Sequence, residues 1–88
     1  MVFRQLLREA IDNSGLTLRE VALLCEEQGA PIDHSYLSKI RSGALPPPSD
    51  KVARVLARVL GLDPMEVALK AYIDRAPEDL RQRLAAAC

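Results

Sequence analysis

The chain repeats one pattern: a short stretch with apolar residues three and four positions apart, followed by a glycine. This spacing places the apolar side chains on one face of a helix. A glycine after the last apolar position is a common helix terminator, because it readily adopts the left-handed conformation that ends many helices. Such stretches stop at Gly15, Gly29, Gly43 and Gly61. No stretch alternates apolar and polar residues for long enough to form a strand, so the sequence predicts an all-α fold.

The length of the chain limits this fold to one small domain. It has 88 residues, of which 49% are hydrophobic, and its aromatic residues are Phe3, Tyr36 and Tyr72, so a mostly aliphatic core is expected. Isolated short helices are marginally stable in water. Five to six of them are therefore expected to pack as a compact bundle. The spacing predicts these inward residues: Phe3, Leu6, Leu7, Ala10, Ile11, Leu18, Val21, Ala22, Cys25, Leu37, Ile40, Val52, Val55, Leu56, Val59 and Leu60.

Polar residues suited to capping precede the later helical stretches. A polar side chain at this position accepts a hydrogen bond from a backbone N–H of the first helical turn. Thr17, followed three residues later by Glu20, has the sequence of a capping box. The fifth helix is expected to end at about Ile73. The predicted starts are Thr17, Asp33, Ser49, Asp63 and, for a short sixth helix, Pro77.

The residue content argues against several classes of protein. The apolar run of residues 21–25, which no other run in the chain exceeds, is far shorter than the roughly 20 residues that span a bilayer. Charged residues between positions 4 and 12 argue against a secretory signal, and a cytoplasmic location is expected. Cys25 and Cys88 lack metal-ligand spacing and are expected to be reduced thiols. With His34 as the single histidine, we expect no metal, no cofactor and no enzymatic activity.

The formal net charge is zero, but the charges are unevenly distributed. Residues 1–33 carry a net charge of −3, residues 34–62 of +4, and the remaining residues of −1. A basic sector of this kind is the electrostatic footprint of a surface that meets phosphates, although a positive face that only meets solvent gives the same pattern. Arg54 and Arg58 are expected to face solvent. The charged residues of the sector are Lys39, Arg41, Asp50, Lys51, Arg54 and Arg58.

The order of motifs in residues 3–62 resembles the phage-repressor-like helix-turn-helix family, of the Cro and Xre type. Members of that family typically read Leu-Thr-x-x-Glu-hydrophobic-Ala, then Ser-x-hydrophobic-Ser-x-hydrophobic-x-x-Gly, then Pro-Ser before an apolar helix. The corresponding segments of this chain are residues 16–22 (LTLREVA), 35–43 (SYLSKIRSG) and 48–49 (PS). The resemblance implies a lambda-repressor-like domain whose third helix, the recognition helix, lies in the major groove of DNA.

The resemblance also assigns roles to individual residues. The expected contacts to DNA bases are His34, Ser35 and Lys39, of which Lys39 can donate to the N7 and O6 atoms of guanine. His34 could equally bind a phosphate, and Ser35 and Ser38 could be ordinary surface residues. Tyr36 could pack its ring against the second helix instead of contacting DNA. The expected contacts to the DNA backbone are Thr17, Tyr36, Ser38, Arg41 and Ser42.

Four features depart from the family pattern. Many relatives have a glutamine that holds a phosphate where this chain has Leu18, and many have a glutamate where it has Arg41. The turn between the second and third helices, residues 26–32, is longer than usual, and the proline run 46–48 lengthens the loop after the recognition helix. The first departure puts the phosphate contact at that position in doubt, and the second makes this chain more basic.

Residues 1–62 are expected to form the helix-turn-helix DNA-binding core. Residues 63–88 are expected to complete the domain and to form a homodimer interface, because they carry more apolar surface than a small core can absorb. Alternatively, the sixth helix covers the core of the monomer. The residues expected at the interface are Val67, Ala71, Ile73, Leu80 and Leu84.

The function expected from these features is that of a sequence-specific transcriptional regulator, a repressor that acts as a homodimer on a palindromic operator. Its partner is then double-stranded DNA. The alternative is a protein-interaction module, such as an antitoxin or an adaptor, that binds its partner through the last two helices.

Overall fold

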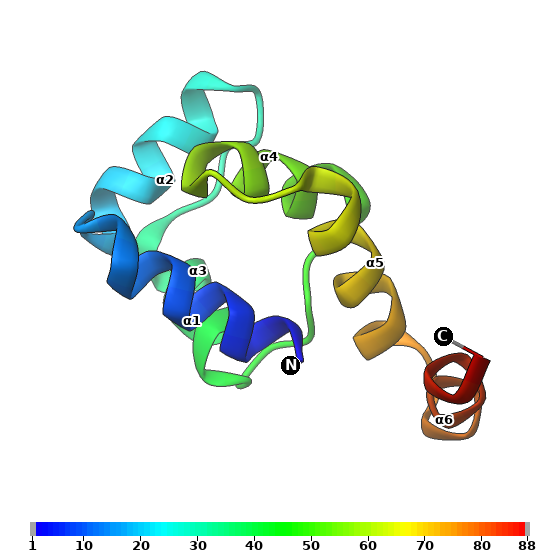
Figure 1. Cartoon of the computed structure of the whole chain (residues 1–88). Helices are drawn as coiled ribbons and strands as arrows, with labels where there is room; N and C mark the ends of the chain where they lie inside the picture. The colour runs from blue at the N-terminus through cyan, green and yellow to red at the C-terminus, as the bar shows by residue number, and fades with distance from the viewer. Residues whose placement is uncertain (1, 88) are drawn as a thin grey trace.

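A computed structural model describes residues 2–87, and within this range it contains six helices and no strand (Figure 1). The predicted all-α fold of five to six helices is confirmed. The helices are α1 (Phe3–Ser14), α2 (Leu18–Glu27), α3 (His34–Ser42), α4 (Asp50–Leu60), α5 (Pro64–Arg75) and α6 (Glu78–Ala87).

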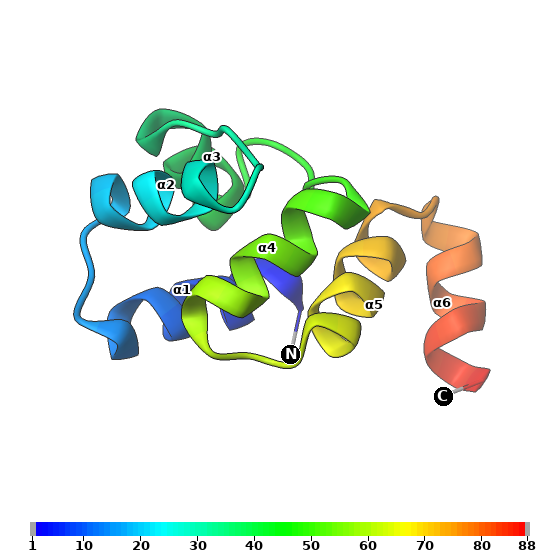
Figure 2. The same ribbon diagram turned by 90° about the horizontal axis from the view of Figure 1, so that it is seen from above.

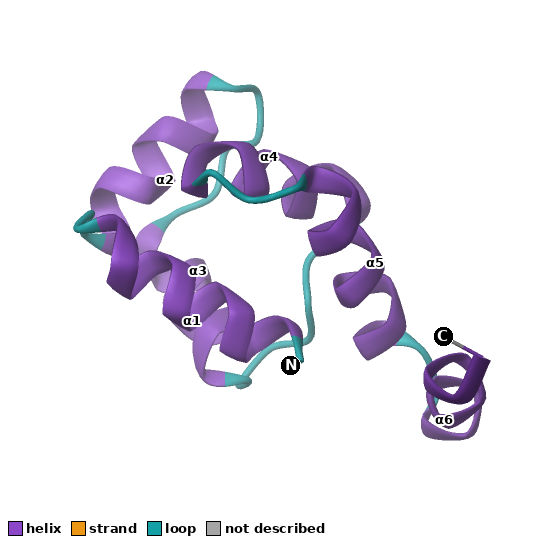
Figure 3. Cartoon of the chain, in the orientation of Figure 1, coloured by secondary structure: helices purple, strands orange, loops and turns teal. Residues whose placement is uncertain are grey.

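Helices α1 to α5 share one core, and α6 lies outside it. α4 packs along α5 and against α2, whereas α3 packs against α1 and α2. α6 lies beside α5 at one end of the molecule (Figures 1 and 2). Short loops join the helices (Figure 3), and the longest within residues 2–87 is the proline-containing segment 43–49 that follows α3.

The core is aliphatic apart from Phe3, as predicted. Leu37 and Val21 are fully buried at its centre, and the loop residues Ala30 and Pro48 are buried as well. Six predicted inward residues are only half-buried, because they lie at the edges of the helical stripes: Leu6, Ala10, Leu18, Val52, Val59 and Leu60. The buried hydrophobic residues are Phe3, Leu7, Ile11, Val21, Ala22, Cys25, Ala30, Leu37, Ile40, Ala53, Val55, Leu56, Ala57, Val67, Ala68 and Ala71.

The predicted caps are found at the starts of the helices. Asp33 accepts a hydrogen bond from the Tyr36 N–H at 2.7 Å, and Asp63 accepts one from the Met65 N–H at 3.1 Å. Ser49 occupies the N-cap of α4, but its side chain makes no capping hydrogen bond. The fourth helix therefore starts without the stabilisation expected from the serine hydroxyl.

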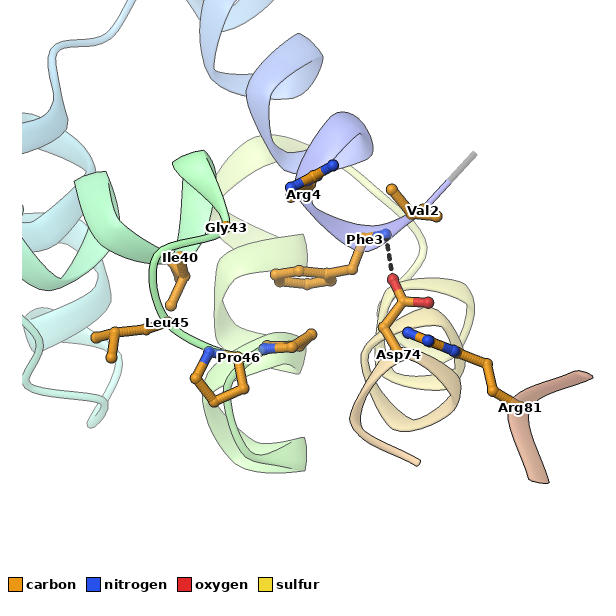
Figure 4. A pocket seen from close by; sticks show the side chains of 10 residues that line it. Val2, Phe3, Arg4, Ile40, Gly43, Leu45, Pro46, Asp74 and Arg81 are labelled. Carbon is orange, nitrogen blue, oxygen red and sulfur yellow. Dashed lines mark hydrogen bonds between the residues drawn. The ribbon is translucent and has the colours of Figure 1, made fainter. Parts of the chain in front are cut away.

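Two long-range hydrogen bonds attach the last turn of α5 to distant parts of the chain. The Phe3 N–H donates to Asp74 Oδ2 at 2.7 Å (Figure 4), which joins the start of α1 to α5. The Arg75 guanidinium donates to the carbonyl of Pro48, which joins α5 to the loop before α4. The start of α1 and the end of the loop that follows α3 are thus held near the C-terminal end of α5.

The predicted dimer interface requires a correction. Val67 and Ala71 are 4% and 0% exposed, because they face the core rather than solvent. Ile73 and Leu84 are half-buried, and Leu80 is exposed. The apolar side chains that α5 exposes are instead Met65, Leu69 and Tyr72, which we call the α5 stripe. No side chain of α6 whose burial the structure describes is fully buried, and α6 packs against α5.

Cys25 is one of the buried core residues, and burial raises the pKa of its thiol to about 11. At neutral pH this cysteine is therefore a protonated, unreactive small hydrophobic residue. Cys88 lies outside the described residues. No helix in residues 2–87 is long and apolar enough to cross a bilayer.

Candidate nucleic-acid interface

Helix α3 presents one clearly defined face to solvent. Successive residues of an α-helix are rotated by about 100°, so the side opposite the buried Leu37 and Ile40 carries Ser35, Lys39 and Ser42. All three are exposed. We call these three residues the α3 row. The row is held outward because the opposite side of the helix is anchored in the core.

The three residues expected to contact bases are all accessible. His34 lies in the first turn of α3 and is exposed, and Ser35 and Lys39 belong to the α3 row. Because Asp33 caps this turn, the start of the helix is well ordered where base contacts are expected. The three side chains are thus accessible to a partner, and their contacts to bases stay predictions.

The residues of α3 expected to contact the DNA backbone differ in exposure. Ser38, Arg41 and Tyr36 are half-buried at the sides of the helix, whereas Ser42 is exposed. The Ser42 hydroxyl donates to the Lys39 carbonyl at 3.1 Å and accepts from the Ala44 N–H at 3.4 Å, so it is engaged at the end of the helix.

Tyr36 packs against the edge of the core. Burial raises the pKa of its hydroxyl, and the nearby positive charge of Arg75 opposes this effect. The hydroxyl is therefore a protonated hydrogen-bond donor at neutral pH. This hydroxyl therefore lies near Arg75, in the last turn of α5.

The start of α2 has the predicted capping box. Glu20 Oε1 accepts from the Thr17 N–H at 2.9 Å, and Thr17 Oγ1 accepts from the Glu20 N–H at 3.1 Å. The Thr17 N–H and hydroxyl hold the pKa of Glu20 below its usual value, so the carboxylate is charged at neutral pH. A phosphate at this helix start would meet that negative charge, and the cation closest in sequence is Arg19.

Arg19 is the first residue near α3 that the sequence analysis missed. It lines a shallow hollow of about 280 Å³ between α2 and the start of α3. The other residues that line this hollow are Ala22, Leu23, Glu26, Ile32, Asp33 and His34. The i, i+3 spacing from the buried Ala22 could have placed Arg19 at the edge of α2.

Arg4 and Arg8, at the other end of α3, were also missed. Together with Gln5 and Ser42 they line a hollow of about 270 Å³ between α1 and the last turn of α3. Arg4 and Arg8 each follow a buried residue of α1, Phe3 and Leu7. They therefore lie on the side of α1 that faces the neighbouring helix α3. Their helical spacing could have shown this flank, but only the folded chain shows which helix lies beside it.

The cations around the α3 row carry uncompensated charge. No described residue forms an ion pair with Arg4, Arg8, Arg19, Lys39 or Arg41. Arg54 differs, because its Nε donates to both carboxylate oxygens of Asp50 at 2.9 and 3.0 Å. The exposed face of α3 is therefore bordered by unpaired positive charge at both ends.

Comparison with known proteins adds one match. A family model described as a helix-turn-helix domain matches residues 2–69, from the start of α1 into the middle of α5. No curated protein and no solved structure gives a significant match.

Proposed function

Because the chain belongs to the helix-turn-helix domain family, we propose that it is a sequence-specific DNA-binding regulator, with α3 as its recognition helix. The match supports the resemblance seen in the sequence. The observation that carries the proposal is the α3 row, held outward by buried Leu37 and Ile40 and bordered by unpaired cations. We place the protein in the cytoplasm with its DNA.

In this proposal, α3 enters the major groove with its first turn toward the bases. The groove is about 12 Å wide and admits a helix. Lys39 donates to guanine N7 and O6, and His34 and Ser35 contact neighbouring base edges. Thr17, Tyr36, Ser38, Arg41 and Ser42 contact the DNA backbone. All of these contacts come from residues 1–62, which form the DNA-binding core in this proposal.

The regulator is proposed to act as a homodimer, since one recognition helix reads too few base pairs for useful specificity. Two helix-turn-helix subunits related by a twofold axis read half-sites about 34 Å apart, which gives a palindromic site. The α5 stripe, with Leu80 of α6, supplies the exposed apolar surface for this pairing. We further propose that the dimer acts as a repressor at this operator.

Selection of bound sequences from a random duplex pool tests the proposal. The expected result is enrichment of one sequence with two inverted half-sites, centred about 10 base pairs apart. Binding that is steeply salt-dependent but shows no enriched sequence would contradict it, because any basic surface attracts DNA in this way.

The α5 stripe leads to a prediction about assembly. Leu69→Glu is expected to convert the dimer to a monomer, because it places a charge in an apolar interface. Leu69 is 51% exposed, so the monomer should keep its helical circular dichroism signal. Mass in solution, by sedimentation equilibrium, measures the change. Leu23→Glu, at a 56% exposed leucine on α2, is the matched control and should leave the mass unchanged. A Leu69→Glu protein that still has the mass of two chains would remove α5 from the interface.

The same stripe favours a second candidate function, that of a protein-interaction module such as an antitoxin or an adaptor. Large apolar side chains on one exposed helix face suit a protein partner as well as a second copy. The random-pool selection separates the two functions, since an interaction module should enrich no DNA sequence.

A further inference from the structure

We infer that the hollow lined by Arg4, Gln5, Arg8 and Ser42 binds phosphates of the DNA backbone, and we call it the α1 phosphate site. The inference rests on the proposed function, because it places α3 in the major groove. It assigns a role to two arginines that lie outside the helix-turn-helix segment itself.

The position of the hollow along α3 is the first argument. Ser42 ends the α3 row and lies seven positions after Ser35, a rise of about 10 Å along the helix. The major groove is about 12 Å wide, with a sugar-phosphate backbone along each edge. When the first turn of α3 contacts base edges, its last turn therefore lies near the edge of the groove. Arg4 and Arg8 then face phosphates rather than bases.

The second argument is that Arg4 lies against the turn that follows α3. Gly43 has φ +87°, and a Cβ atom placed there would lie 2.5 Å from Arg4 Nη1 and 3.2 Å from its Cδ. The Arg4 side chain therefore lies against the backbone of this turn. Arg4 and Gly43 also line the neighbouring pocket of Figure 4, which is separate from the α1 phosphate site and includes Asp74. A guanidinium next to the recognition helix can bind a phosphate through two parallel hydrogen bonds.

The third argument is charge. Arg4 and Arg8 are one helical turn apart, so their like charges repel, and neither is paired with a described carboxylate. No acidic side chain lines this hollow, whereas Glu26 and Asp33 line the hollow beside Arg19. An anion between the two guanidinium groups would relieve the repulsion. The end of α3 near α1 is thus the better phosphate site of the two.

The experiment measures the dependence of DNA affinity on salt. R4A/R8A, the wild type and the control R58A/R83A are titrated against a random-sequence duplex and against the selected duplex. Arg58 and Arg83 are exposed on α4 and α6, so the control removes the same charge from other surfaces. Log affinity falls linearly with log salt concentration, and each phosphate contact makes this dependence steeper by about 0.9. R4A/R8A is expected to make this dependence less steep by about 1.8 per chain on both duplexes. The base preference is expected to stay unchanged.

Two further variants keep the test decisive. R4K/R8K is expected to retain most of the salt slope, because it retains both charges. If R4A/R8A unfolds, R8A alone is used, since Arg8 is exposed on α1 and makes no contact with Gly43. R8A is expected to lower the slope by about 0.9 per chain.

The outcomes separate this inference from the proposed function. If the wild type binds its selected duplex and R4A/R8A keeps the salt slope of the control, the α1 phosphate site is wrong and the recognition role of α3 stands. A change in the selected sequence would also overturn it, since the arginines would then read bases. A wild type that binds neither duplex contradicts the proposed function and this inference together.

Discussion

Phe3→Ala is expected to lower the free energy of unfolding by about 3–5 kcal/mol, a large part of the roughly 5–15 kcal/mol that stabilises a typical domain. Phe3 is 1% exposed although it stands at the start of the first helix. Its side chain packs between α1, α4 and α5, where it lines a small internal hollow with Leu56 and Val67. Removal of the ring leaves a cavity that these neighbours cannot fill.

Urea denaturation followed by circular dichroism measures this loss. Val2→Ala is the control, because Val2 is 43% exposed, and it should change the free energy of unfolding by no more than about 0.5 kcal/mol. Phe3→Leu should cost less than Phe3→Ala, since it retains most of the apolar volume. A loss below about 1 kcal/mol for Phe3→Ala would show that the start of α1 does not hold the core together.

The starts and ends of the helices could be predicted because they depend on local chemistry. Thr17 and Glu20 form their capping box within four residues of chain. The glycines after α1, α3 and α4 adopt the left-handed conformation expected of helix terminators. The inward faces of α1 and α3 could be predicted for the same reason, since each helix has one apolar stripe.

The inward face of α5 could not be predicted, because this helix has apolar residues on nearly all sides. Small residues decide its orientation: Ala68 and Ala71 of α5 are buried, as are Ala53 and Ala57 of the adjacent α4. Small side chains on both helices allow their backbones to approach closely. The larger side chains of the α5 stripe are left outside, a result of tertiary packing that the pattern of one helix cannot reveal.

The charges around α3 show the same limit. The basic sector of the sequence includes Arg54, which the structure pairs with Asp50 one turn earlier on α4. The cations that border the α3 row include Arg4, Arg8 and Arg19, which come from the acidic sector of the sequence. Net charge along the chain therefore predicts a basic surface, but the fold determines which residues compose it.

Lys39→Ala is expected to weaken binding to the selected duplex by about 1–3 kcal/mol per half-site and to relax the preference at one base pair. With two half-sites, the loss for a dimer is about 2–6 kcal/mol, a reduction in affinity of roughly 30-fold to 10⁴-fold. The reason is that the ammonium group lies on the α3 row and has no ion pair with a described residue. It is therefore available to donate to a guanine.

Titration against the selected duplex and against duplexes changed at single positions tests this role. Arg41→Ala, which removes the same charge from the half-buried flank of α3, should weaken binding to every sequence alike and lower the salt slope by about 1. Unfolding by urea should be nearly unchanged for Lys39→Ala, since Lys39 is exposed. An equal loss of affinity on all duplexes would make Lys39 a phosphate contact, because a phosphate carries no information about the base attached to it.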